Sequence, residues 1–204
     1  MGGKSYKGGD FITTAIESAL KDLDNVFPAG EDGFYYQGQE LAGKECKEVP
    51  AFQGIDTLHK LYAVLRQSWK AETAYRSCQG EWIPTDPSYG QCAITAMLVY
   101  DMFGGSIHRI RVEGGETHYF NKIDGHYVDL TREQFDLYHI PVKYEPNEKM
   151  NREYCGKNPD TKARYHQLQR NMIKFLRDKN SGDIAGKSSN MSTGYQKSPH
   201  SSGD

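Results

Sequence analysis

Three residues of this chain, Cys92, His118 and Asp129, have the types and the order of a cysteine-dependent acyl-transfer site. A cysteine is a strong nucleophile only as its thiolate, which forms readily at a helix N-terminus beside a histidine. Cys92 opens a predicted helix that ends near Phe103, and the other two residues lie on a predicted β-hairpin. The sequence therefore predicts a nucleophile, a base and a residue that orients the base.

The hairpin is predicted by the pair Asp124-Gly125, which separates two runs typical of strands, residues 117–123 and 126–130. With this pair as the loop, Ile123 faces His126 and Asn121 faces Val128, and the next pair would be Phe120 with Asp129. A slip of one residue in this register would exchange the two faces of one strand.

In this register His118 and Asp129 share one face of the hairpin, because side chains alternate along a strand. They are diagonal neighbours, within reach of a hydrogen bond if the side chains lean together. Asn121, a rival orienting residue, falls on the opposite face. His118 and His126 also fall on opposite faces, which argues against a metal shared by His108, His118 and His126.

Two groups are candidates for stabilising an oxyanion, the side chain of Gln91 and the backbone N–H of Cys92. Gln91 has a competing role, because Ser88 lies three residues before it and the two match a capping box. Cys92 and Asp129 also have structural alternatives. Cys92 would be a buried cysteine on an apolar helix, and Asp129 would cap the helix that starts near Thr131.

Composition excludes several classes of protein. The formal net charge of the 204 residues is −2, so no overall positive field favours nucleic acid. No apolar run approaches the roughly 20 residues that span a membrane, and the N-terminus lacks the apolar core of a signal peptide. These features predict a cytoplasmic protein that binds neither membrane nor nucleic acid.

The cysteines are widely spaced, and none forms a C-x-x-C pair. They are Cys46, Cys78, Cys92 and Cys155. This spacing disfavours zinc, and a reducing compartment favours free thiols over two disulfides. We therefore expect neither a metal nor an organic cofactor.

Hydrophobic patterning divides the chain into four parts. Residues 1–9 are predicted to be flexible, residues 10–55 to be an N-terminal addition, residues 56–177 to form the main domain and residues 178–204 to be a disordered tail. The addition contains a predicted helix from Phe11 to about Val26, capped by Asp10, and a short strand at residues 34–36.

Within the main domain a helix is predicted from Thr57 to Ala71, capped by Asp56, with Lys60, Arg66 and Lys70 exposed. A strand follows the Cys92 helix at residues 107–112, with a turn at Gly114-Gly115.

A short helix is predicted at residues 131–138 with Glu133 and Asp136 exposed, followed by an irregular stretch at residues 141–159. The last helix begins at a predicted cap, Asp160, and runs to about Arg177.

Several of these segments resemble the bacterial YunG family. The resemblance lies in Gly90-Gln-Cys-Ala-Ile-Thr-Ala96, Phe103-Gly-Gly105, His118-Tyr-Phe-Asn121 and Val128-Asp-Leu-Thr131, and in Leu65-Arg-Gln-Ser-Trp69 with Glu72-Thr73. It covers about residues 57–134 and continues more weakly through the last helix. The YunG family itself implies no settled biochemical activity.

The same segments are similar to transglutaminases and papain-like cysteine enzymes, which implies an α+β fold with a buried nucleophile helix packed on a small antiparallel sheet. Transglutaminases carry a Gly-Gln-Cys start to that helix, as residues 90–92 do here. They usually have Trp directly after the cysteine, whereas this chain has Ala93, which weakens the case for cross-linking chemistry.

These patterns predict a cysteine-dependent amide hydrolase or acyl transferase, that is, a peptidase, a deamidase or a transglutaminase-like enzyme. Its substrate would be a peptide, a protein side chain or a small amide. The alternative is a non-catalytic binding module that keeps the fold and contacts a protein partner through residues 10–55.

Overall fold

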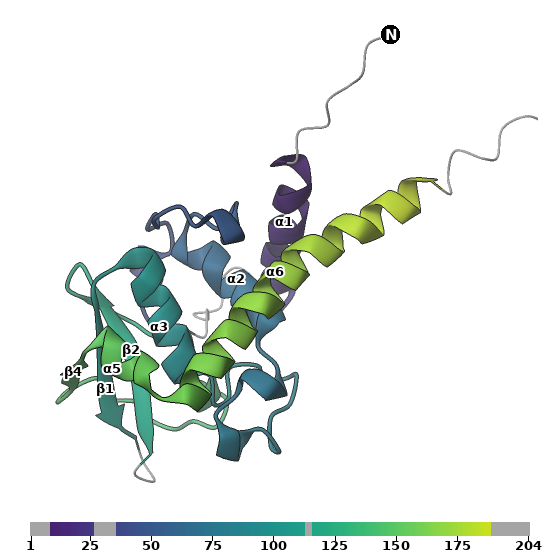
Figure 1. Ribbon diagram of the computed structural model, residues 1–204. Helices are drawn as coiled ribbons and strands as arrows, with labels where there is room; N and C mark the ends of the chain where they lie inside the picture. The colour runs from purple at the N-terminus through teal and green to yellow at the C-terminus, as the bar shows by residue number, and fades with distance from the viewer. Residues whose placement is uncertain (1–8, 27–35, 113–115, 189–204) are drawn as a thin grey trace, which may run out of the picture.

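The computed structural model describes residues 9–26, 36–112 and 116–188 (Figure 1). The helices in these ranges are α1 (Gly9–Val26), α2 (Leu58–Ser68), α3 (Cys92–Phe103), α4 (Glu133–Asp136), α5 (Arg152–Lys157) and α6 (Pro159–Ser188). The strands are β1 (Ser106–Arg111), β2 (Thr117–Ile123), β3 (His126–Val128) and β4 (Glu148–Met150). The predicted strand at residues 34–36 and the turn at Gly114-Gly115 fall largely or wholly outside the described residues.

The strands form one antiparallel sheet in the order β3-β2-β1-β4. Helix α3 packs against β2 and β1 on one face of this sheet, and α6 crosses the other side of α3 (Figure 1). Asn121 of β2 fastens the helix to the sheet, because its Nδ2 donates to the carbonyl of Ala96 at 2.9 Å. The predicted α+β architecture, with a buried helix on a small antiparallel sheet, is confirmed.

The β2–β3 hairpin has the predicted loop and register. Ile123 pairs with His126, and Asn121 pairs with Val128. Asp124 and Gly125 adopt φ values of 48° and 87°, and two such left-handed residues match the twist of a two-residue hairpin. The β2–β3 ladder ends at the pair of Asn121 and Val128, so the predicted pair of Phe120 with Asp129 does not form. The backbone of Asp129 instead exchanges two hydrogen bonds with Gln37, at 3.0 and 3.1 Å.

The N-terminal segment shares the core of the main domain. Helix α1 packs on α2 and α6 through buried Ala15, Ile16, Ala19 and Leu23. Phe52 and Ile55 join the same cluster. None of the four cysteines is disulfide-bonded. Among the described helices, none is long and apolar enough to cross a lipid bilayer.

Helix boundaries differ from the predictions where a neighbouring residue makes the better cap. Thr57, not Asp56, caps α2 by accepting the N–H of Lys60, while the Asp56 carboxylate pairs with the Lys60 ammonium. Asn158, not Asp160, caps α6 by accepting the N–H groups of Asp160 and Thr161 at 2.8 and 3.2 Å.

Two helix ends and one stretch expected to be irregular also depart from the prediction. Helix α2 ends at Ser68, and Ala71 begins a separate 3-10 turn. Helix α6 continues to Ser188, past the predicted end near Arg177. The stretch expected to be irregular, residues 141–159, contains β4 and α5.

The prediction that Glu133 is exposed is wrong. Its side chain is 2% exposed and forms an ion pair with Arg66, whose side chain is 12% exposed. The hydroxyl of Tyr62 donates to the same carboxylate oxygen at 3.3 Å. Glu133 is buried because α4, a single helical turn, contacts α2 at Tyr62 and Arg66. The charge of Arg66 compensates part of the desolvation of the Glu133 carboxylate.

Removing one partner of this buried pair should therefore be costly. We expect Glu133→Gln to lower the free energy of unfolding by about 3 kcal/mol, because it removes the carboxylate from the buried ion pair with Arg66. The double variant Arg66→Met/Glu133→Leu should recover most of that loss. Urea unfolding measures both. The control is Asp56→Asn, which breaks an exposed ion pair with Lys60 and should cost less than about 1 kcal/mol. Equal losses of stability in Glu133→Gln and Asp56→Asn would contradict the prediction.

Candidate active site

Cys92 is the first residue of α3 and follows a tight turn. Gly90 in that turn has a φ of 72°, and a Cβ on it would lie 2.8 Å from the Cβ of Cys78, so this position requires glycine. At the first position of a helix, the N–H of Cys92 has no intrahelical partner and points out of the helix end. The positive end of α3 therefore lies at the thiol.

The predicted capping box between Ser88 and Gln91 is wrong. Gln91 itself is the N-cap residue, no side chain caps the helix, and the Ser88 hydroxyl has no hydrogen-bond partner. The Gln91 side chain is buried, and its Nε2 donates to the carbonyl of Lys70 at 3.1 Å. That bond ties the start of α3 to the segment after α2.

His118 and Asp129 form a buried pair. The Nε2 of His118 lies 2.6 Å from Oδ2 of Asp129, and the two residues are 1% and 2% exposed. The other carboxylate oxygen, Oδ1, accepts the backbone N–H of Thr131 at 3.0 Å and its hydroxyl at 2.9 Å. Asp129 thus bonds the histidine with one oxygen and the turn at Thr131 with the other, but it does not cap α4, whose N-cap residue is Arg132 and has no side-chain cap.

Burial and charge act in opposite directions on this pair. Burial alone would lower the pKa of His118, but the charge and the hydrogen bond of Asp129 outweigh it and raise that pKa to about 10. Burial likewise opposes the charged form of Asp129, yet His118 and Thr131 hold the pKa of the carboxyl below its ordinary value. The pair is therefore an imidazolium and a carboxylate at neutral pH.

The other ring nitrogen of His118, Nδ1, is buried and makes no hydrogen bond. Cys92 lies close enough to the ring for its side chain to contribute to the raised pKa of His118. Phe135 meets the ring edge-on, with centroids 4.7 Å apart and planes at 87°, which restricts its rotation. The structure thus brings together the three predicted residues, Cys92, His118 and Asp129.

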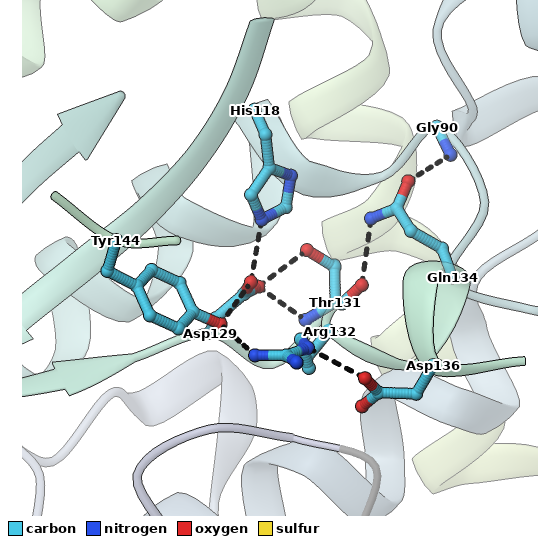
Figure 2. A network of polar contacts seen from close by, with 8 residues as sticks. All are labelled: Gly90, His118, Asp129, Thr131, Arg132, Gln134, Asp136 and Tyr144. Atoms are coloured by element: carbon cyan, nitrogen blue, oxygen red, sulfur yellow. Dashed lines mark hydrogen bonds and ion pairs between the residues drawn. The ribbon is translucent and has the colours of Figure 1, made fainter. Parts of the chain in front are cut away.

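A second set of polar residues surrounds the pair (Figure 2). The hydroxyl of Tyr144 donates to Oδ2 of Asp129 at 3.0 Å, and Arg132 donates to that hydroxyl at 3.3 Å. Gln134 accepts the N–H of Gly90 at 3.3 Å and donates to the carbonyl of Thr131 at 2.8 Å. Gln134 therefore connects the turn before Cys92 to the turn after Asp129.

Sequence patterns missed Tyr144 and Gln134. Tyr144 lies in a polar stretch without periodicity, and Gln134 lies on a helix of a single turn. The one available signal was the large number of tyrosines, 14 in the chain, which says nothing about position.

Cys92 and His118 open onto a cavity of about 860 Å³. Aromatic side chains from separate segments line it, and the side chain of Gln91 does not reach it. The lining aromatic residues are Tyr75, Tyr89, Tyr119, Phe135, Tyr138 and Tyr154.

The other polar residues considered as an orienting group or as metal ligands make hydrogen bonds away from Cys92 and His118. Asn121 bonds Ala96 on the opposite face of the sheet. His108 contacts Ser106 and Asn147 through its two ring nitrogens, and His126 contacts Glu40 at the surface. Within the described parts of the chain, no group of three His, Cys, Asp or Glu side chains is arranged to hold a metal ion.

The raised pKa of His118 makes its contribution to stability depend on pH. That contribution is complete below about pH 6.5, where the unfolded histidine is also protonated, and is lost as the pH rises through the folded-state pKa of about 10. We expect the difference in unfolding free energy between the wild type and His118→Gln to narrow steadily from pH 6.5 to pH 10. Denaturant titrations of both proteins at several pH values measure this difference. A difference in unfolding free energy between the wild type and His118→Gln that stays constant or widens over this pH range would contradict the ion pair of His118 with Asp129.

Comparison with known proteins identifies a family whose matched region spans the candidate site. The model of the YunG protein family matches residues 57–177, which include Cys92, His118 and Asp129. The uncharacterized protein YunG of Bacillus subtilis (strain 168) is 38% identical over 82 residues, which is 40% of this chain and 64% of that relative. The chain thus matches slightly less than two thirds of that protein's length. No solved structure matches the chain. Since the family model covers more than half of its residues, the protein belongs to the YunG family.

Proposed function

We propose that this protein is a cysteine-dependent amide hydrolase or acyl transferase, with Cys92 as nucleophile, His118 as acid and base, and Asp129 as the residue that orients His118. One observation carries the proposal. The buried His118–Asp129 pair leaves Nδ1 as the one ring nitrogen without a hydrogen bond, and Cys92 lies beside that ring in the same cavity.

The first half of the reaction acylates Cys92. The Sγ thiolate, stabilised by the His118 imidazolium and the positive end of α3, attacks the carbonyl carbon of an amide and forms a C–S bond. The C–N bond then breaks, and Nδ1 of His118 gives its proton to the leaving nitrogen. The products are an amine, or ammonia, and a thioester at Cys92.

The second half releases the acyl group. Nδ1, now unprotonated, takes a proton from water or from a second amine as that nucleophile attacks the thioester carbon. The C–S bond breaks and restores the thiolate beside the imidazolium. Water gives an acid, and an amine gives a new amide.

The backbone N–H of Cys92 is the better oxyanion donor. It is unpaired within the helix, as the first N–H of α3 must be. The Gln91 side chain, the other predicted donor, already donates to the carbonyl of Lys70 and does not line the cavity. Gln91 supports the turn that holds Cys92 instead.

The arrangement supports a papain- or transglutaminase-like fold. In such a fold the nucleophile begins a helix that packs on an antiparallel sheet, and the base and its orienting residue follow on neighbouring strands. Here Cys92 begins α3, His118 lies on β2 and Asp129 follows β3. The presence of Ala93 after the cysteine favours hydrolysis over cross-linking.

The cavity favours a polypeptide substrate over a small amide. Its volume of about 860 Å³ is larger than one small amide fills. Three of its tyrosines, Tyr75, Tyr138 and Tyr154, are more than half exposed. Exposed tyrosines around a pocket are typical of surfaces that bind polypeptide segments, because the ring provides apolar area at low entropic cost.

Alkylation tests the Cys–His site. An ordinary thiol with a pKa of about 8.5 is only about 1% thiolate at pH 6.5. We expect iodoacetamide to label Cys92 at pH 6.5 about tenfold faster or more than such a thiol, and His118→Ala to remove that advantage. Peptide mass spectrometry at each cysteine measures the rates, with Cys78 and Cys155 of the same cavity as internal controls. Slow labelling of Cys92 in both proteins would remove the main support for catalysis.

Peptidyl affinity labels test the substrate class. We expect an acyloxymethyl ketone carrying phenylalanine to label Cys92 faster than one carrying glycine, and Tyr75→Ala and Tyr154→Ala to reduce this preference several-fold. Iodoacetamide labelling should stay unchanged in these variants, because they remove no part of the Cys–His pair. Ile83→Ala is the control, since Ile83 is also exposed but does not line the cavity. Equal labelling by the two ketones would favour a small substrate.

A further inference from the structure

Tyr144 occupies a defined place behind the His118–Asp129 pair. It lies between α4 and β4, with its ring packed on Phe120 at a centroid distance of 4.8 Å and on Tyr127 at 5.5 Å. This packing directs its hydroxyl at Oδ2 of Asp129, 3.0 Å away (Figure 2). Burial and the charge of Asp129 raise the pKa of Tyr144 far above its ordinary value, so the hydroxyl is a neutral donor at every relevant pH.

Oδ2 of Asp129 accepts two hydrogen bonds that compete. One comes from Nε2 of His118 at 2.6 Å and the other from Tyr144 at 3.0 Å. Oδ1 accepts the backbone N–H and the hydroxyl of Thr131. Each donor withdraws electron density from Oδ2, the acceptor that the two donors share. This weakening of each bond by the other is strong because the site is buried. The Tyr144 hydroxyl therefore weakens the hold of Asp129 on the imidazolium proton.

Arg132 strengthens this effect. Its Nη1 donates to the Tyr144 hydroxyl at 3.3 Å, and its Nε is held by Asp136 at 2.8 Å. A cation that donates to the hydroxyl oxygen makes the hydroxyl a better donor to the next acceptor. The three groups Arg132, Tyr144 and Asp129 form one directed chain that ends at the oxygen facing His118 (Figure 2).

We propose that Tyr144 is a positioning residue that moderates the His118–Asp129 pair, so that His118 remains able to give its proton to a leaving group. The inference rests on the proposed function, because only an acid–base role requires the proton to leave. A general acid works best when its pKa is not far above the working pH. An Asp129 carboxylate without the Tyr144 hydrogen bond would retain that proton more strongly.

Titratable groups act on the His118 ring both directly and through Asp129. Cys92 faces it from α3 and Asp129 faces it from the end of β3, while Tyr144 and Arg132 act through Asp129. Tyr144→Phe removes one hydroxyl from this set and keeps the ring that packs on Phe120. A change in the titration of His118 in this variant therefore reports the hydroxyl.

The test is NMR of the His118 imidazole in the full chain. We expect Tyr144→Phe to raise the pKa of His118 by roughly one pH unit, as for the loss of one hydrogen bond to a charged group. The Nε2 proton shared with Asp129 should also move downfield, because its hydrogen bond becomes stronger. Circular dichroism confirms that the variant is folded.

Tyr127→Phe is the matched control. Tyr127 belongs to the same aromatic cluster, but its hydroxyl contacts Glu145 and Asn147 and not Asp129. An unchanged or lowered pKa of His118 in Tyr144→Phe would overturn the proposal, as would equal shifts in the two variants. Failure of the proposed function is separate, because it would appear as alkylation of Cys92 that does not depend on His118.

Discussion

The buried contact between His118 and Asp129 is the interaction on which the rest of the site depends. Two opposite charges lie 2.6 Å apart where almost no water reaches them, so neither tolerates the loss of the other. Thr131, Tyr144 and the ring of Phe135 surround the pair and complete its contacts.

The scaffold brings the thiol to this pair from a different part of the chain. The left-handed turn at Gly90 and the buried Gln91 direct α3 so that Cys92 lies at its positive end. Asn121 then fixes the same helix to the strand that carries His118, but through the opposite face of that strand. Strand β2 thus holds α3 with one face and carries His118 on the other, which fixes the position of His118 relative to α3.

Local patterns predicted the parts of the site with strong periodicity or turn chemistry. The apolar run after Cys92 identified α3, and Asp124-Gly125 identified the hairpin and its register, which in turn placed His118 beside Asp129. Patterns failed where a long-range contact decides the outcome. Glu133 is polar on a short helix, and only the distant Arg66 explains its burial. Gln91 looked like a local cap, but its partner is a carbonyl 21 residues earlier in the chain.

The link that Gln134 makes between Gly90 and Thr131 has a consequence for the nascent chain. Gln134 bonds Gly90, 44 residues earlier in the chain, and contacts of such sequence separation form late in folding because closing the loop costs entropy. Cys92 is synthesised before His118, Asp129 and Gln134 and lies beside none of them until they dock. If the proposed chemistry holds, the chain acquires its reactive sulfur only once it is folded, and an unfinished or unfolded copy is protected from acylating itself or its neighbours.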